Sequence, residues 1–241
     1  MSTYQELYDS VDTLQDWINL FQDENVEYDD FLLSISEYKK GDETFRVLGN
    51  IGGDWEYSPD DKDLVAKFDS VYDNKYVLKS ELSTFEKYNY NYGYDKFAPD
   101  ELANHIAKRL KFKNYVCNVN RQPTGCQVNL HVDSLTCWTL DNPDLSYLKF
   151  DKKLRQPVNH PTMHRVFVAL SDWQPGWMWQ FGHDHWTEWK KGDVVWFNWR
   201  HVPHATANCG YAPRDVLKIS GTSSFIDQIL SNHAKFQFDC L

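Results

Sequence analysis

From residue 113 onward, short segments of the chain alternate apolar and polar side chains, and this pattern restricts the possible folds more than any other feature. The alternating segments are residues 115–120, 127–133, 165–170, 178–181, 194–199 and 215–220. A period of two residues is typical of half-buried β-strands. Turns that contain glycine or proline, such as Pro175-Gly176 and Gly192-Asp193, separate the segments. Short strands that follow one another so closely predict a β-sandwich or a β-barrel.

Two segments before residue 113 have the different spacing of amphipathic helices. Residues 3–21 carry apolar side chains at intervals of three and four residues, with Ser2 or Thr3 as the expected N-cap. A second helix is expected to start near Pro99, because proline is favoured in a first turn. It places five apolar side chains on one face: Leu102, Ala103, Ile106, Ala107 and Leu110.

The organisation expected from these patterns is one continuous domain. Residues 1–112 form a helical and irregular flank, in which 22–95 is acidic and broken by glycine and proline. Residues 113–241 form the β core. At 241 residues the chain is long enough to bury a substantial core.

Charge and composition argue against several classes of partner. The net charge of −10, with the acidic excess before residue 100 and no basic patch, argues against binding to duplex nucleic acid. The start of the chain lacks a secretory signal, and no apolar run is long enough for a membrane span. The five cysteines include no C-x-x-C pair. A cytoplasmic protein with reduced thiols is the expectation.

A candidate metal site begins with His131-Val132-Asp133. Positions i and i+2 of a strand point to the same face, so the imidazole and the carboxylate can bind one ion. Two histidines and one carboxylate leave open positions on an octahedral iron, which is the ligand set of non-haem Fe(II) oxygenases. The motif therefore predicts an iron site that needs one more histidine.

Candidates for that second histidine are His183, His185, His201 and His204. A hairpin centred on Cys209 would place His204 opposite Arg214 on one face, and an arginine beside the metal suits a carboxylate ligand. We therefore choose His204 and keep His201 as the alternative. His183 and His185 follow Gly182 in an expected turn, where a surface or substrate-contact role is favoured.

These residues resemble the 2-oxoglutarate- and Fe(II)-dependent oxygenases. The similar stretches are 120–125 leading into His131 and Asp133, and 190–197 leading into His204 and Arg214. Together they cover roughly residues 113–222. The resemblance implies a mainly β fold with flanking helices, in which a double-stranded β-helix, a jelly-roll or cupin-like barrel, holds iron at its open end.

The resemblance also implies an activity. The chain would be a dioxygenase that uses Fe(II), O2 and 2-oxoglutarate to hydroxylate a substrate, releasing succinate and CO2. Arg214 would bind the C5 carboxylate of 2-oxoglutarate. The segment from His164 to Arg214 is most similar to the aspartyl/asparaginyl β-hydroxylase-like proteins, in which an arginine corresponding to Arg165 also binds the cosubstrate. Those proteins typically lack the carboxylate ligand that Asp133 supplies here.

Other roles stay open at this point. Asn118 and Asn120 alternate on the first barrel strand, where they either bind the cosubstrate or face solvent. The substrate is a protein side chain, an amino acid or another small molecule. Two rival functions are a cupin-like metal-binding protein without oxidation and a peptide-binding module that uses the abundant aromatic side chains.

Overall fold

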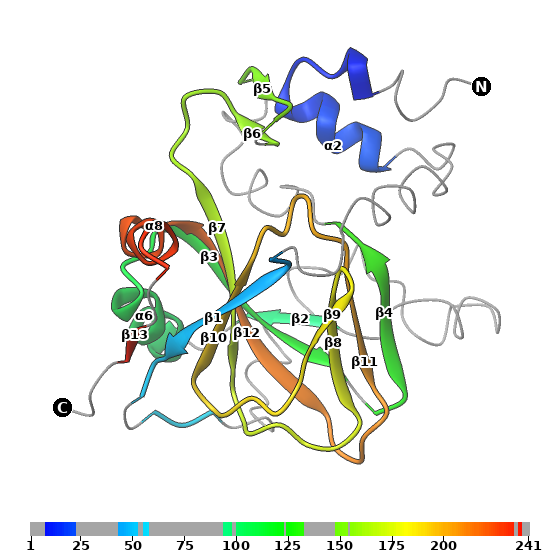
Figure 1. Ribbon diagram of the computed structural model, residues 1–241, viewed down its shortest axis with the longest axis vertical. Helices are drawn as coiled ribbons and strands as arrows, with labels where there is room; N and C mark the ends of the chain where they lie inside the picture. Colours follow the sequence, from blue (N-terminus) through cyan, green and yellow to red (C-terminus); the bar gives the residue numbers. More distant parts are fainter. Residues whose placement is uncertain are drawn as a thin grey trace.

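The computed structural model of the chain (Figure 1) describes residues 8–22, 43–52, 55–57, 94–97, 100–122, 124–132, 148–153, 155–233 and 236–237. Most of these residues belong to two mainly antiparallel sheets that face each other; only β1 and β13, among the described strands, pair in parallel. The seven-stranded sheet consists, in spatial order, of β13 (Phe236–Gln237), β1 (Phe45–Asn50), β10 (Asp193–Phe197), β7 (Met163–Ala169), β12 (Arg214–Thr222), β3 (Lys113–Gln122) and β2 (Tyr94–Phe97). The four-stranded sheet consists of β4 (Cys126–His131), β11 (His204–Asn208), β8 (Trp177–Phe181) and β9 (Asp184–Trp186).

Successive strands cross between the two sheets. β3 lies in the seven-stranded sheet and β4 in the four-stranded one; β10 lies in the larger sheet, β11 in the smaller, and β12 in the larger again. This crossing winds the eight strands β3, β4 and β7 to β12 into a double-stranded β-helix, which confirms the predicted fold class. The predicted strands all form, with ends shifted by about one or two residues.

The predicted hairpin that pairs His204 with Arg214 is wrong. His204 begins β11, which pairs with β4 and β8, whereas Arg214 begins β12, which pairs with β3 and β7. The physical reason is the crossing: residues 209–213 carry the chain from one sheet to the other, and each sheet buries one face against its opposite. The two side chains therefore lie on opposite walls of the barrel.

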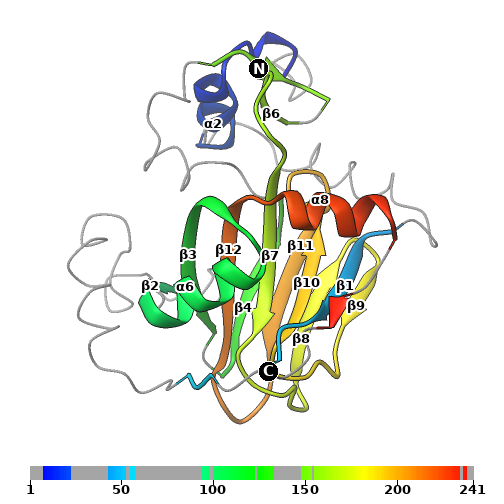
Figure 2. The same ribbon diagram turned by 90° about the vertical axis from the view of Figure 1, so that its left-hand side faces the viewer.

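Around the two sheets lie helices and a small two-stranded sheet: α2 (Leu14–Gln22), α6 (Asp100–Arg109), α8 (Ser224–Ser231), β5 (Phe150–Asp151) and β6 (Gln156–Pro157). α6 and α8 cover the outer face of the seven-stranded sheet (Figure 2). The five residues predicted for the buried face of the helix after Pro99 are all buried, four of them in α6 and Leu110 directly after its end, so this prediction is confirmed. α2 packs with β5 and β6 beyond one end of the barrel, where Trp17 stacks on Phe150 at 5.2 Å.

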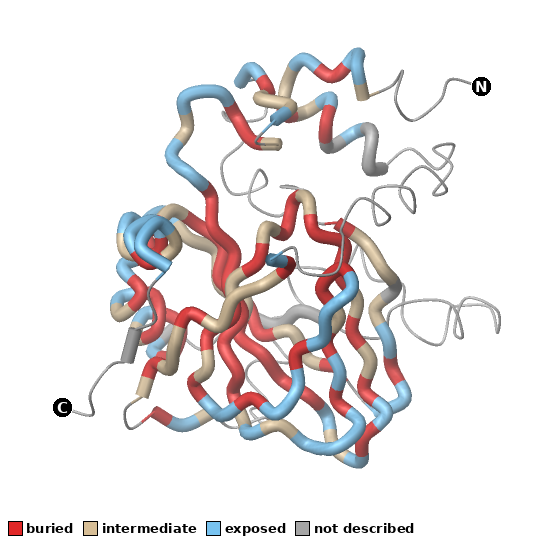
Figure 3. The backbone as a smooth tube through the Cα atoms, viewed as in Figure 1, coloured by how far each residue is buried: buried red, intermediate tan, exposed pale blue. Residues whose placement is uncertain are grey.

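Two cores share the central strands, which are buried along most of their length (Figure 3). The inner core between the sheets is mainly aromatic and includes Phe167 and Trp179. The outer core lies between the seven-stranded sheet and the helices and includes Val166 and Leu217. Along β7 and β12, successive side chains therefore point alternately into the inner core and into the outer core. The side chains that point into the inner core are the ones that can line a site.

The first predicted helix is interrupted within its apolar pattern: residues 8–10 are helical, residues 11–13 are not, and α2 begins at Leu14. Thr13 and Asp16 form a reciprocal cap, in which the Thr13 N–H donates to Asp16 Oδ2 at 2.8 Å and the Asp16 N–H donates to Thr13 Oγ1 at 3.2 Å. This capping box begins α2 at Leu14. Ser2 and Thr3, the predicted caps, lie outside the described residues. Among the helices that the structure describes, none has the length and apolar character to cross a membrane.

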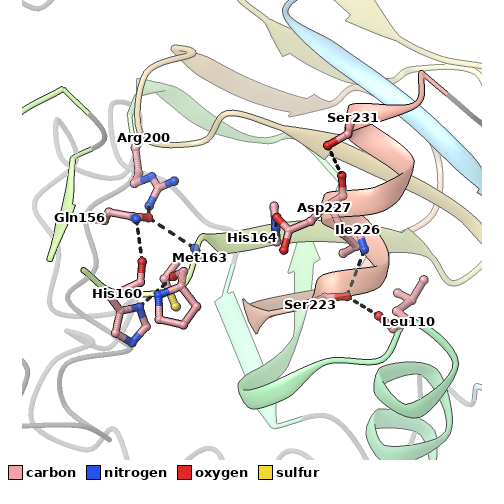
Figure 4. A network of polar contacts seen from close by, with 11 residues as sticks. Leu110, Gln156, His160, Met163, His164, Arg200, Ser223, Ile226, Asp227 and Ser231 are labelled. Carbon is pink, nitrogen blue, oxygen red and sulfur yellow. Dashed lines mark hydrogen bonds and ion pairs between the residues drawn. The ribbon is translucent and has the colours of Figure 1, made fainter. Parts of the chain in front are cut away.

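A buried histidine joins the sheet to α8 and gives a test of stability (Figure 4). His164 Nε2 lies 2.8 Å from Asp227 Oδ1. Burial lowers the pKa of His164 below its ordinary value of 6.5; the Asp227 contact raises this pKa and the Arg200 charge lowers it further, and the net result is a decrease. The folded chain therefore keeps the ring neutral at pH values where the unfolded chain protonates it. Stability is lost as the pH falls through about 6.5.

We expect the free energy of unfolding to decrease from about pH 7 to about pH 5, with a slope from this group of at most about 1.4 kcal/mol per pH unit. His164→Gln should flatten this part of the profile in chemical denaturation. His183→Gln, which removes an exposed histidine, is the matched control and should keep the slope. Identical profiles for His164→Gln and the unchanged chain would contradict the assignment.

Candidate metal and cosubstrate site

His131 and His204 lie beside each other on neighbouring strands of the smaller sheet. His131 ends β4, His204 begins β11, and the two residues are direct partners in the antiparallel ladder. Their ring centroids are 4.3 Å apart, with the ring planes at 47°. Two imidazoles this close on neighbouring strands can supply two ligands to one metal ion.

A β-bulge places His131 on this face. Thr206 pairs with Val128 and His204 pairs with His131, so two steps along β11 correspond to three steps along β4. Strict alternation would turn His131 away from the face that carries Val128. The extra residue restores it, as bulges do when they redirect a side chain near a site.

The surroundings of His204 fix how its ring can bind. His204 is buried, and its Nδ1 lies 3.1 Å from the Val202 carbonyl oxygen. A carbonyl only accepts, so Nδ1 carries the proton and Nε2 is the lone-pair nitrogen, as in histidines that bind metals. Phe197 packs against the ring edge-on at 4.7 Å. The ring is therefore held in one orientation with the correct nitrogen for coordination.

The third predicted ligand, Asp133, lies outside the described residues, so its role stays a prediction. Within the described ranges, no group of three or more His, Cys, Asp or Glu side chains could hold a metal ion. The donor chemistry of His131 and His204 fits Fe(II), which accepts imidazole ligands and leaves positions for other ligands.

The two histidines open into a pocket inside the barrel. Its empty space, which includes open solvent at its mouth, is about 360 Å³. The lining residues come from both sheets: Asn120, Val128, His131, Phe167, Trp179, His204, Thr206 and Lys218. Phe167 and Trp179 form an aromatic wall, and their ring centroids are 4.3 Å apart. The pocket thus combines metal-type ligands, apolar walls and a few polar groups, as small-molecule sites do.

Arg214 lies deeper in the barrel and is fully buried. Its Nη1 donates to the Met178 carbonyl oxygen at 2.9 Å, and its guanidinium carbon lies 4.8 Å from the Trp179 ring centroid. Its Nε and Nη2 have no hydrogen-bond partner among the described residues. Burial lowers the pKa of Arg214 to about 9, with Asp215 opposing this decrease, so the group stays charged at neutral pH. A buried cation with two unsatisfied donors is costly unless an anion binds it.

Arg214 contacts the Trp179 wall but does not itself line the pocket. Lys218, four residues later on the same face of β12, does line it. Lys218 was not predicted from the sequence, although it is four residues from Arg214 and the alternation of a strand puts both on the inner face. Thr206 was also not predicted, although its position two residues after His204 on a strand places it on the same face as His204.

The other predicted cosubstrate residues are divided by the fold. Asn120 lines the pocket. Asn118 is buried one alternation step away, directly opposite Lys218 in the ladder, and is not among the lining residues. Arg165 is buried on β7, two residues before Phe167, and its Nε donates to Ser220 Oγ at 2.8 Å. The structure therefore brings Asn120 to the histidines and places Asn118 and Arg165 outside the pocket lining.

The other histidines considered as the second ligand lie outside the pocket. His183 is in the turn between β8 and β9, and His185 is in β9; both are exposed. His201 lies in the turn before β11, where its N–H donates to the Asn198 carbonyl at 2.9 Å. None of the three lines the pocket.

No family model and no curated protein matches the sequence. Solved structures with a similar fold include a prolyl hydroxylase from Trichoplax adhaerens in complex with a peptide of hypoxia inducible factor, with 14% identity over 84% of this chain and 94% of that chain and a TM-score of 0.39. A Pseudomonas putida prolyl-4-hydroxylase has 17% identity over 54% of this chain and 72% of that chain, with a TM-score of 0.35. CytC3 with Fe(II) and alpha-ketoglutarate has 13% identity over 76% of this chain and 74% of that chain, with a TM-score of 0.37. At these identities the activities of those proteins do not transfer, and the function has to be argued from the site residues.

Proposed function

We propose that the chain is a non-haem Fe(II) oxygenase that uses 2-oxoglutarate and O2, with His131, Asp133 and His204 holding the iron. The observation that carries this proposal is the facing pair of histidines at a pocket inside a double-stranded β-helix. Iron and 2-oxoglutarate, when bound, would supply the oxidising chemistry that hydroxylates the substrate and releases succinate and CO2.

The chain's own residues bind, orient and exclude water. The Val202 carbonyl fixes the tautomer of His204. Phe167 and Trp179 provide a dry wall that strengthens charge interactions inside the pocket. We propose that Arg214 binds the distal carboxylate of 2-oxoglutarate, because its unsatisfied Nε and Nη2 require an acceptor.

Other polar groups assist the same cosubstrate. Lys218 and Asn120 line the same pocket as the histidines, so we propose that they contact the body of 2-oxoglutarate. The positive charge of Lys218 complements a dicarboxylate. The substrate is proposed to be a protein side chain or a small molecule. The likeness to the aspartyl/asparaginyl β-hydroxylase-like proteins stays a prediction.

Anaerobic spectroscopy tests the assignment directly. Adding Fe(II) and 2-oxoglutarate together to the full chain should produce the weak visible band of their complex, and admitting O2 should release succinate even without substrate. No band at saturating concentrations of both would overturn the proposal. Metal binding without 2-oxoglutarate binding would favour a cupin-like metal-binding protein instead.

A further inference from the structure

Two arginines, Arg165 and Arg200, stack on Trp199, and Arg155 joins them through a hydrogen bond to the Arg200 backbone; we call Arg155, Arg165 and Arg200 the arginine cluster. The guanidinium carbons of Arg165 and Arg200 lie 4.3 Å and 5.1 Å from the Trp199 ring centroid. Arg155 Nη1 donates to the Arg200 carbonyl oxygen, and its guanidinium carbon lies 5.3 Å from the Trp17 ring centroid. Stacking on indole rings partly offsets the cost of burying these cations.

Two members of the arginine cluster have donors that the described structure leaves unused. The Nε atoms of Arg155 and Arg200 are buried and have no hydrogen-bond partner there. Arg200 Nη1 donates to Gln156 Oε1 at 2.7 Å (Figure 4). A neutral amide holds this guanidinium in place but does not neutralise it. Buried donors without acceptors and buried charges without counter-charges both cost free energy.

The neighbouring cations act on the pKa of Arg200. Burial, together with the charges of Arg165 and Arg155, lowers the pKa of Arg200 to about 10. Elsewhere the fold pairs such a group: Arg121 Nε and Nη2 each donate to Asp215 at 2.9 Å. The net charge of the chain is −10, so acidic residues are plentiful. Arg155 and Arg200 nonetheless form no ion pair with a carboxylate of the described residues.

The arginine cluster adjoins the pocket. Arg165 is two residues from Phe167 on the inner face of β7, and Phe167 lines the pocket. Trp199 is two residues beyond Phe197, whose ring contacts His204. A molecule held at the histidines therefore has the arginine cluster beside it.

We propose that the arginine cluster binds an oxyanion, a carboxylate or phosphate group, of a small-molecule substrate. Planar guanidinium groups suit the paired oxygens of such a group, and the bound anion would satisfy the unused Nε donors. That the anion belongs to the substrate rests on the proposed function; that an anion binds does not.

Titration of the iron-free full chain with inorganic phosphate and, separately, with acetate tests the proposal. Calorimetry and thermal unfolding at constant ionic strength should show saturable binding and a melting temperature that rises with anion concentration. Arg155→Gln and Arg200→Gln should each weaken binding by about tenfold or more. Arg155 is only half-buried, so its variant keeps the test decisive where Arg200→Gln fails to fold. The matched control is Arg46→Gln, which removes the same charge from the Glu43 ion pair and should leave anion binding unchanged.

Tighter binding of phosphate identifies a phosphate-bearing substrate, and tighter binding of acetate identifies a carboxylate-bearing one; both support the proposal. The absence of saturable binding, or equal weakening by Arg46→Gln, overturns it. The visible band of the Fe(II) and 2-oxoglutarate complex separates the two proposals. A band without anion binding refutes only the arginine cluster, and anion binding without a band refutes only the oxygenase.

Discussion

Replacing His204 with alanine is expected to remove 2-oxoglutarate turnover and to weaken Fe(II) binding by more than about 100-fold. That factor is about the upper limit for losing only an outer hydrogen-bond partner of a metal ligand. The expectation follows from geometry: His204 presents Nε2 beside the facing ring of His131, and the Val202 carbonyl holds it in that state. His131→Ala and Asp133→Ala should have the same effect. Metal titration and succinate release measure the two losses.

The control for these variants is His185→Ala, which removes an exposed histidine of β9 and should leave both readouts unchanged. His204 is buried, so its alanine variant also leaves a cavity. His204→Gln, which fills more of that space, should retain more stability and still lose turnover. Turnover that survives in a folded His204 variant would exclude this residue as a ligand and return His201 to consideration.

Arg214→Met is expected to weaken 2-oxoglutarate binding by about 10- to 100-fold, the effect of losing one or two hydrogen bonds from a charged group. Fe(II) affinity should change little, because no metal ligand is removed. Methionine fills much of the volume without the buried charge, so the unliganded chain should unfold at the same temperature or higher. Stabilisation by a given concentration of added 2-oxoglutarate should decrease accordingly.

Lys218→Met distinguishes which cation anchors the cosubstrate. Lys218 lines the pocket, whereas Arg214 contacts it through Trp179. We expect Lys218→Met to weaken 2-oxoglutarate binding less than Arg214→Met does, because Arg214 has the unsatisfied donors. The opposite order in matched calorimetric titrations would move the anchor to Lys218. Equal loss of iron and 2-oxoglutarate in Arg214→Met would show a general disruption of the site instead.

The sequence predicted most of the elements because their signals are local. The period-two segments and the turns between them identified the strands, and the apolar face from Leu102 to Leu110 identified α6. The start of α2 depends on a capping box of Thr13 and Asp16, a four-residue signal that the longer apolar stripe concealed. β1 was missed, because its residues lie in a stretch whose composition is acidic and irregular.

Strand partners were the part that local patterns did not supply. The turn around Cys209 has the composition of a hairpin, yet it connects strands in different sheets. His204 was nevertheless chosen on the basis of that hairpin. In the structure its position is supported instead by pairing with His131 across β4 and β11.

The sequence by itself determined the fold class and a short set of candidate iron ligands. Both depend on periodicity and residue type, which can be read from residues that are close together in the sequence. Only the tertiary structure decided that the bulge in β4 turns His131 inward, that Lys218 reaches the pocket, and that Arg165 and Arg200 meet at Trp199 with Arg155 bonded to the Arg200 backbone. These arrangements depend on how the two sheets pack against each other. Burial of the aromatic inner core fixes the strand register and determines which side chains face one another, and these side chains come from segments far apart in the chain.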